Sequence, residues 1–181
     1  MSRARVRADE RGGAHVLLLA LLGAVFAVLL LTTSIDWMLQ SANKTKSKLA
    51  LDRATHAAAT HVNLDEAMYG RLSWDESAGR DEFRRFLRLN FGLDAEGEPV
   101  AGGRLEQAPV VHMLEFVSAG TYPATVARTV VVDEGTDTET RRTIDVTVYG
   151  PSVVAIVEVH QRVRGRLEPV VLSSVASVRF R

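Results

Sequence analysis

The longest hydrophobic run of the chain begins close to its N-terminus. No residue from Gly12 to Ile35 carries a formal charge, which is roughly 24 residues or about 36 Å of α-helix at 1.5 Å per residue. A helix needs about 20 apolar residues to cross the hydrocarbon core of a membrane. The pattern therefore predicts a transmembrane helix over 14–35. Its limits are marked by Ala14, Val16, Leu31 and Ile35.

The residues around this run predict its orientation. Arginines at positions 3, 5, 7 and 11 precede it, and Trp37 follows it where an interfacial aromatic anchor belongs. Basic residues beside the first span favour a cytoplasmic N-terminus. We therefore expect 1–13 to be a cytoplasmic segment and the C-terminal part to be extracytoplasmic. A cleaved signal peptide is the alternative, but its apolar region is usually about 7–15 residues long, so a retained single-pass anchor in the cell (cytoplasmic) membrane fits better.

Beyond the span, apolar residues recur at helical spacing with polar residues between them. No Gly or Pro interrupts 24–69, so we expect one helix to leave the membrane and continue over 36–62, with a kink near Thr45 as an alternative. Within it, the stretch LDRATHAAATH is rich in small residues, which allow close approach of another element. The candidate helix-packing surface is Ala50, Ala54, Ala57, Ala58 and His61.

The remaining pattern, over 63–181, predicts an α+β extracytoplasmic domain. Ser73 and Glu76 have the spacing of a capping box, and an apolar face with Phe83 and Leu87 follows, so a second helix is expected over about 74–91. From about residue 110 the period changes to two and β-branched residues dominate. Four to five short strands make about one small antiparallel sheet. The expected fold class is thus α+β: a long N-terminal helix, a short helix and a small antiparallel sheet.

Composition and motifs reduce the number of functions that the sequence supports. Lys and Arg number 22, as do Asp and Glu, so the zero net charge gives no electrostatic case for nucleic-acid binding. There is no cysteine. His56 and His61 lie about 140° apart around a helix, while His112 and His160 fall in predicted strands. We therefore expect no metal, no cofactor and no catalytic residue, and an enzyme such as a membrane-tethered hydrolase is disfavoured by the lack of a catalytic motif.

The N-terminal third has the order and character of a known family. A basic segment ending in DERGGA is followed by a Leu/Ala/Val span and by a helix ending in KLALDRATHAAA. Over residues 7–62 the chain resembles the TadE/TadG-like, pseudopilin-type membrane proteins, in which an alanine-rich helix typically follows the span. Prepilin-like members carry a glycine with a glutamate five residues on, where a peptidase cuts. Here leucines stand five residues after Gly12 and Gly13, so we expect a permanent anchor rather than a processed, polymerising subunit.

The resemblance implies a bacterial cell-membrane protein that serves a pilus-like or secretion-type assembly. Its partners would be the lipid bilayer, other subunits of the assembly and further copies of the chain itself. The expected function is that of a membrane-anchored, non-enzymatic structural component. The alternative is a single-pass membrane protein whose extracytoplasmic domain binds a ligand or a partner as a sensor or regulator.

Overall fold

The computed structural model describes residues 10–69, 71–103, 105–118, 120–163 and 165–177 of the 181 residues. Most of the predicted cytoplasmic segment, including the arginines at 3, 5 and 7, lies outside the described residues. The chain divides into two compact units, 1–41 and 42–181. Helix α1, Glu10–Ala59, contributes to both units.

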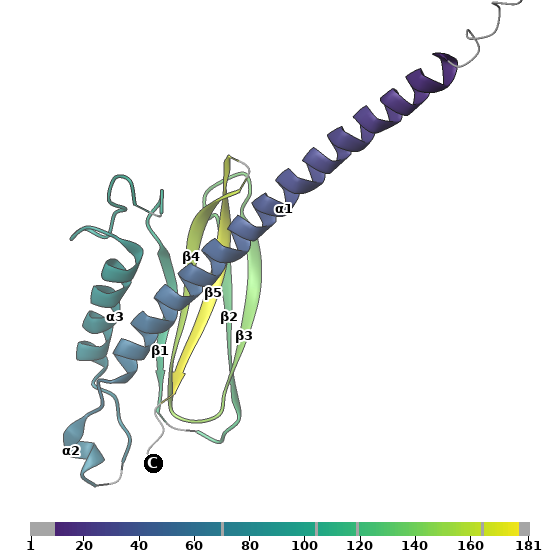
Figure 1. Ribbon diagram of the computed structural model, residues 1–181. Coiled ribbons are helices and arrows are strands. Elements are labelled where there is room, and N and C mark those ends of the chain that lie inside the picture. Colours follow the sequence, from purple (N-terminus) through teal and green to yellow (C-terminus); the bar gives the residue numbers. More distant parts are fainter. Residues whose placement is uncertain (1–9, 70, 104, 119, 164, 178–181) are drawn as a thin grey trace, which may run out of the picture. The chain divides into compact units, whose positions relative to one another are not determined.

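In the first unit, residues 13–35 of α1 carry no formal charge and are exposed. Figure 1 draws this part of the helix at the violet end of the ribbon. Val16 is 69% exposed and Leu31 is 61% exposed. The hydroxyls of Thr32, Thr33 and Ser34 donate to carbonyls three or four residues earlier, so their polar groups are satisfied inside the helix, as a lipid environment requires. Among the described residues, α1 is the one helix long and apolar enough to cross a membrane.

In the second unit, α1 runs without a break through Thr45 and ends at Ala59. Asn63 then caps a short helix, α2, Leu64–Ala67, by accepting from the amides of Asp65 and Glu66. Helix α3 is Glu76–Phe91 and ends at Gly92, whose φ of 70° is the left-handed conformation of a helix stop. The predicted serine cap of α3 is wrong: Asp75 accepts from the amide of Ala78 instead, because the aspartate stands directly before the first turn.

Five antiparallel strands follow: β1, Val110–Val117; β2, Ala124–Val132; β3, Thr140–Val148; β4, Ser152–Val163; and β5, Arg166–Ser177. They form a three-stranded sheet of order β1-β4-β5 and a separate two-stranded sheet of β2 and β3. The predicted α+β class, with a long helix, a short helix and antiparallel strands, is confirmed. The strands divide between two sheets rather than one because β2 and β3 pair only with each other and turn their valines toward the face of β4.

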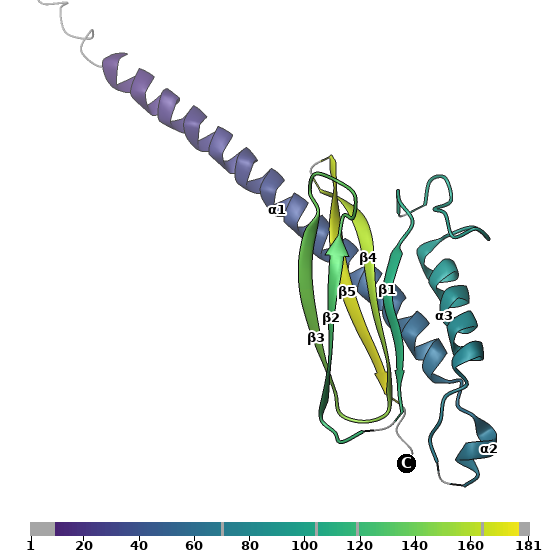
Figure 2. The same ribbon diagram turned by 180° about the vertical axis from the view of Figure 1, so that it is seen from behind.

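Strand β4 is the centre of this unit and is buried on both faces. On one face, Val153, Ala155, Val157 and Val159 join a core with Leu51, Ala54 and Ala58 of α1 and the apolar side of α3. On the other face, Val154 packs with Val146 and Val148 of β3, and Ile156 with Val130 and Val132 of β2. Figure 2 shows the β2–β3 hairpin on the side of the three-stranded sheet away from α1. The unit therefore has three layers, helical, sheet and sheet.

Candidate functional site

The predicted helix-packing surface lies against the chain's own domain. Ala54 and Ala58 are fully buried and Ala50 is 5% exposed, whereas Ala57 and His61 are half-buried. Polar contacts hold the same helix to the sheet: Ser174 Oγ donates to Asp52 Oδ1 at 2.6 Å, and Gln161 Nε2 donates to Ser47 Oγ at 3.3 Å. The small side chains thus allow α1 to lie close on β4 and β5, and the exposed face of the stretch is the opposite one.

The other residues considered from the sequence lie apart from one another. Trp37 is 75% exposed in the first unit, and His56 is exposed on α1. Three arginines of α3 pair with acids of the same helix: Arg80 with Glu76, Arg84 with Asp81 and Arg85 with Glu82.

A cluster of charged side chains lies between the two sheets, at one end of β4. It consists of His112, Asp133, Glu158 and His160, and we call it the acid–histidine cluster. Glu158 and His160 follow Val154 and Ile156 on the same face of β4, since alternate residues of a strand share a face. Glu158 is 2% exposed. The layer between the sheets is therefore apolar along most of its length and charged at this end.

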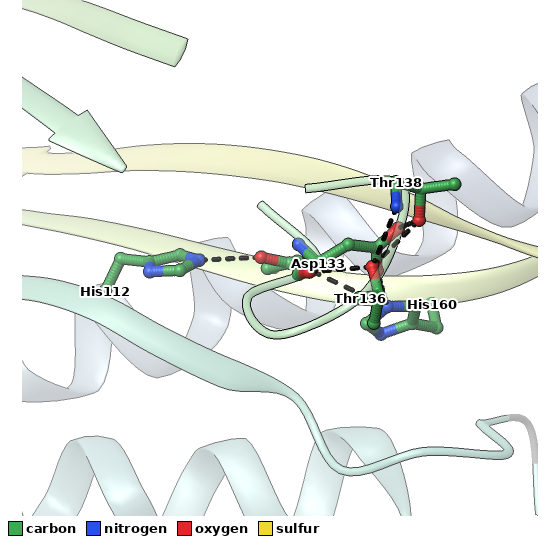
Figure 3. Close-up of polar contacts among 6 residues, drawn as sticks. His112, Asp133, Thr136, Thr138 and His160 are labelled. Atoms are coloured by element: carbon green, nitrogen blue, oxygen red, sulfur yellow. Dashed lines mark hydrogen bonds and ion pairs between the residues drawn. The ribbon is translucent and has the colours of Figure 1, made fainter. Parts of the chain in front are cut away.

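The cluster is connected by short contacts (Figure 3). His112 Nε2 lies 2.8 Å from Glu158 Oε2, and His160 Nε2 lies 2.7 Å from Asp133 Oδ1. His160 Nε2 is also 3.5 Å from Glu158 Oε1. The amide of Asp133 donates to Glu158 Oε1 at 3.2 Å. Each carboxylate therefore has at least one imidazole beside it.

Local backbone features bring these side chains together. The register of β1 against β4 shifts between Val111 and Met113, so His112 is the extra residue of a β-bulge, a feature that redirects a side chain. Asp133 follows the last residue of β2 and has a φ of 55°, a left-handed conformation that Asp tolerates better than most residues. Thr138 Oγ1 donates to Asp133 Oδ2 at 3.0 Å. The bulge and the turn thus orient one member each.

The electrostatics of the cluster favour an ionised Asp133. The hydrogen bond from His160 holds the pKa of Asp133 below its ordinary value; burial acts in the opposite direction, and the hydrogen bond from Thr138 adds to the lowering. Nδ1 of His160 is enclosed and has no hydrogen-bond partner among the described residues. A neutral His160 therefore carries its proton best on Nε2, where Asp133 accepts it.

A cavity of about 420 Å³ opens beside the cluster. His112, Asp133, Glu158 and His160 all line it, together with Thr136 of the turn. Asp133, Glu158 and His160 each offer one ligand atom, and these three atoms lie within 4.8 Å of one another. A larger cavity, of about 680 Å³, lies beside the exposed face of the alanine stretch, between Arg53 and His56 of α1 and Phe86 of α3.

The sequence contained a signal for the cluster, although the spacing of the histidines did not show it. The run VVAIVEVH is apolar on both faces until Glu158 and His160. Charged side chains two residues apart in such a strand are unusual, because a buried charge requires a partner. The partners themselves, His112 of β1 and Asp133 of the turn after β2, could be identified only in the folded chain.

Comparison of the chain with protein-family models, with curated proteins and with solved structures gave no match.

Proposed function

We propose that this chain is a membrane-anchored, non-enzymatic structural component of a pilus-like or secretion-type assembly. The observation that carries the proposal is the division of α1. Residues 13–35 of α1 carry no formal charge and are exposed, while Leu51, Ala54 and Ala58 of the same helix are buried in a folded domain.

The resemblance over residues 7–62 gives the kind of assembly. Because Ala54 and Ala58 are buried within the chain's own domain, contacts with other subunits would use the exposed face of α1, including Arg53, His56 and Thr60, and the unpaired edges of the sheets.

Substituted cysteines test the anchor and its orientation cleanly, since the chain has no cysteine of its own. Thr147→Cys, on the exposed side of β3, should react with a membrane-impermeant maleimide on intact spheroplasts. Ser2→Cys should react only after the membrane is permeabilised. The reverse pattern, or equal labelling of both variants, would overturn the proposed orientation.

Photocrosslinking tests the assembly. A photoreactive residue at position 56 or 60 of the membrane-embedded protein should give crosslinks to another subunit or to a second copy of the chain. Position 145, exposed on β3, serves as the comparison site. If none of these positions yields a protein crosslink, the structural role is wrong even where the anchor is correct.

The acid–histidine cluster favours a second candidate, an anchored extracytoplasmic domain that binds a ligand. Its carboxylates and imidazoles converge on a cavity of about 420 Å³, which is an arrangement typical of ligand sites. The two candidates differ in a measurable way. Asp133→Asn should leave the crosslinks from position 56 unchanged if the protein is a structural component, and should alter them if a ligand at the cluster controls the partner.

A further inference from the structure

We propose that Asp133, Glu158 and His160 form a binding site for a divalent first-row transition-metal ion, with Zn²⁺ as the best fit. The inference goes beyond the role in an assembly and does not depend on it. It rests on the geometry, the charge and the outer contacts of the acid–histidine cluster.

The distances suit a shared ion. Zn²⁺ binds imidazole nitrogen and carboxylate oxygen at about 2.0–2.2 Å, which places neighbouring ligand atoms of a tetrahedron about 3.3–3.6 Å apart. His160 Nε2 lies 3.5 Å from Glu158 Oε1 and 2.7 Å from Asp133 Oδ1, and all three ligand atoms lie within 4.8 Å of one another. Small side-chain rotations would therefore bring the three atoms into one coordination sphere.

The charges also suit a dication. Two carboxylates meet here with little contact to water: the side chain of Glu158 is 3% exposed and that of Asp133 is 14% exposed. Negative charge in a poorly solvated site is costly unless an opposite charge balances it. A divalent ion between the two carboxylates would supply that balance.

The surrounding groups can orient the ligands. His112 Nε2 contacts Glu158 Oε2 at 2.8 Å, on the oxygen that does not face His160. Thr138 Oγ1 donates to Asp133 Oδ2, the oxygen that does not face the imidazole. In each carboxylate a neighbouring side chain thus holds the oxygen that does not face His160, as outer-shell groups of metal sites do, and Glu158 Oε1 also accepts from the amide of Asp133. His112 and Thr138 are therefore positioning residues in this proposal.

The donor set selects the class of ion. One imidazole and two carboxylates suit Zn²⁺ and its first-row neighbours, whereas Mg²⁺ and Ca²⁺ prefer sites made of oxygen alone. Three protein ligands leave a coordination position for water or for a small ligand, and the adjoining cavity of about 420 Å³ provides the room. The ion would join the β2–β3 turn to β4 and so fasten the two sheets to each other.

The test uses the full-length protein in detergent, stripped with EDTA and dialysed at pH 7.5. Titration calorimetry with ZnCl₂ should show one ion per chain, and a parallel titration with MgCl₂ should show at least 100-fold weaker binding. His160→Gln and Asp133→Asn should each weaken Zn²⁺ binding at least 100-fold. His112→Gln should weaken it about 10-fold with the stoichiometry unchanged.

His56→Gln is the matched control, because it removes an exposed histidine of α1 that does not line the cavity of the cluster, and it should leave the affinity unchanged. Circular dichroism shows whether each variant is folded. If the cluster variants do not fold, X-ray absorption at the zinc edge of the native protein decides: a shell of nitrogen and oxygen with one imidazole supports the site. No saturable binding below 100-fold molar excess of Zn²⁺, equal binding by native protein and His160→Gln, or a shell with no imidazole would overturn it.

Discussion

The two faces of β4 are both buried, but by different kinds of side chain. Toward α1, each alternate residue from Val153 to Val159 is apolar and fully buried. Toward β2 and β3, Val154 and Ile156 are equally apolar, but Glu158 and His160 continue the row. The helical side is closed mainly by an apolar core of small, aliphatic and aromatic side chains, such as Ala54, Leu51 and Phe83. The sheet side ends in charges that are tolerated only because histidines and a backbone amide meet them.

The apolar face of β4 therefore contributes mainly to stability, whereas the charged end of the other face carries groups that can bind. The apolar face gains free energy in proportion to the area that it removes from water. The charged end gains little by comparison, since a buried ion pair repays its desolvation only with good geometry. Charges kept at such a place, lining a cavity, are therefore better explained by binding than by folding.

The largest effect is expected from placing a charge on the wrong face. Val157→Asp puts a carboxylate beside Glu158 in sequence but on the helix-facing side, where Val157 is fully buried and the neighbours are apolar. An unpaired buried charge costs several kcal/mol, a large part of the roughly 5–15 kcal/mol that stabilises a domain. Denaturant unfolding followed by circular dichroism should show the domain largely unfolded.

Val157→Ala is the control for that experiment. It removes only part of an apolar side chain, so a loss of about 1.5–3 kcal/mol at most is expected. Equal stability of the aspartate and alanine variants would show that the helical face tolerates charge, and the contrast between the faces would fail.

A double-mutant cycle measures the coupling within the charged end. His112→Gln and Glu158→Gln, made singly and together in EDTA, should show a coupling energy near the upper part of the usual range of about 0.5–3 kcal/mol, because both side chains are largely buried. The exposed pair of Asp81 and Arg84 should give about 0.3–0.5 kcal/mol or less. A coupling in the cluster as small as that of the surface pair would contradict the description of the cluster as a connected unit.

A substitution at Gly79 tests how closely the helical layer is packed. A Cβ at this position of α3 would lie 2.8 Å from the Phe116 ring and 3.2 Å from the carbonyl of Ala58. Gly79→Ala should therefore destabilise the domain by about 1–3 kcal/mol, although alanine favours an exposed helix by about 1 kcal/mol over glycine. The free energy of unfolding of Gly79→Ala should be lower than that of the native protein. A higher value would show that the helical layer has room for the added methyl group.

Ser77→Ala is a control in the same helix, since Ser77 is exposed and its replacement should be nearly neutral. The companion variant Phe116→Leu, combined with Gly79→Ala, should recover part of the loss if the ring is the obstacle.

The smallest effect is a dependence of stability on acid. The pKa of Asp133 lies below its ordinary value of 3.8, first because of the hydrogen bond from His160. A carboxyl with a lowered pKa in the folded state contributes stability that is present above its unfolded pKa and is lost as pH falls through the folded pKa. Unfolding free energy measured from pH 5 downward should decline less steeply in Asp133→Asn than in the native protein. Parallel curves would show that Asp133 contributes nothing.

The elements of the fold could be predicted because each depends on a local pattern. The apolar run, the glycine at position 92 and the alternation of Ile144, Val146 and Val148 act over a few residues. The predicted N-cap of α3, Ser73, lies two residues before the observed one, Asp75. Both residue types are good N-caps, and the local sequence does not distinguish between them.

The separation into two sheets and the cluster between them could not be predicted in this way. The pairing of β1 with β4 joins residues far apart in the chain, so it cannot be predicted from a local pattern. The sequence showed Glu158 and His160 on one strand face, but their meeting with His112 and Asp133 depends on a bulge in β1 and on a left-handed residue after β2.

The sequence by itself determined an apolar helix long enough to cross a membrane, a helix of small residues after it and a set of antiparallel strands. These elements could be predicted because the periods of helices and strands appear in the pattern of neighbouring residues. Only the tertiary structure decided that Ala54 and Ala58 are covered by the chain's own sheet. It also decided that two histidines and two carboxylates from two strands and a turn share one cavity. Such convergence depends on packing between distant segments, which stabilises the fold through buried area and leaves no periodic signal in the chain.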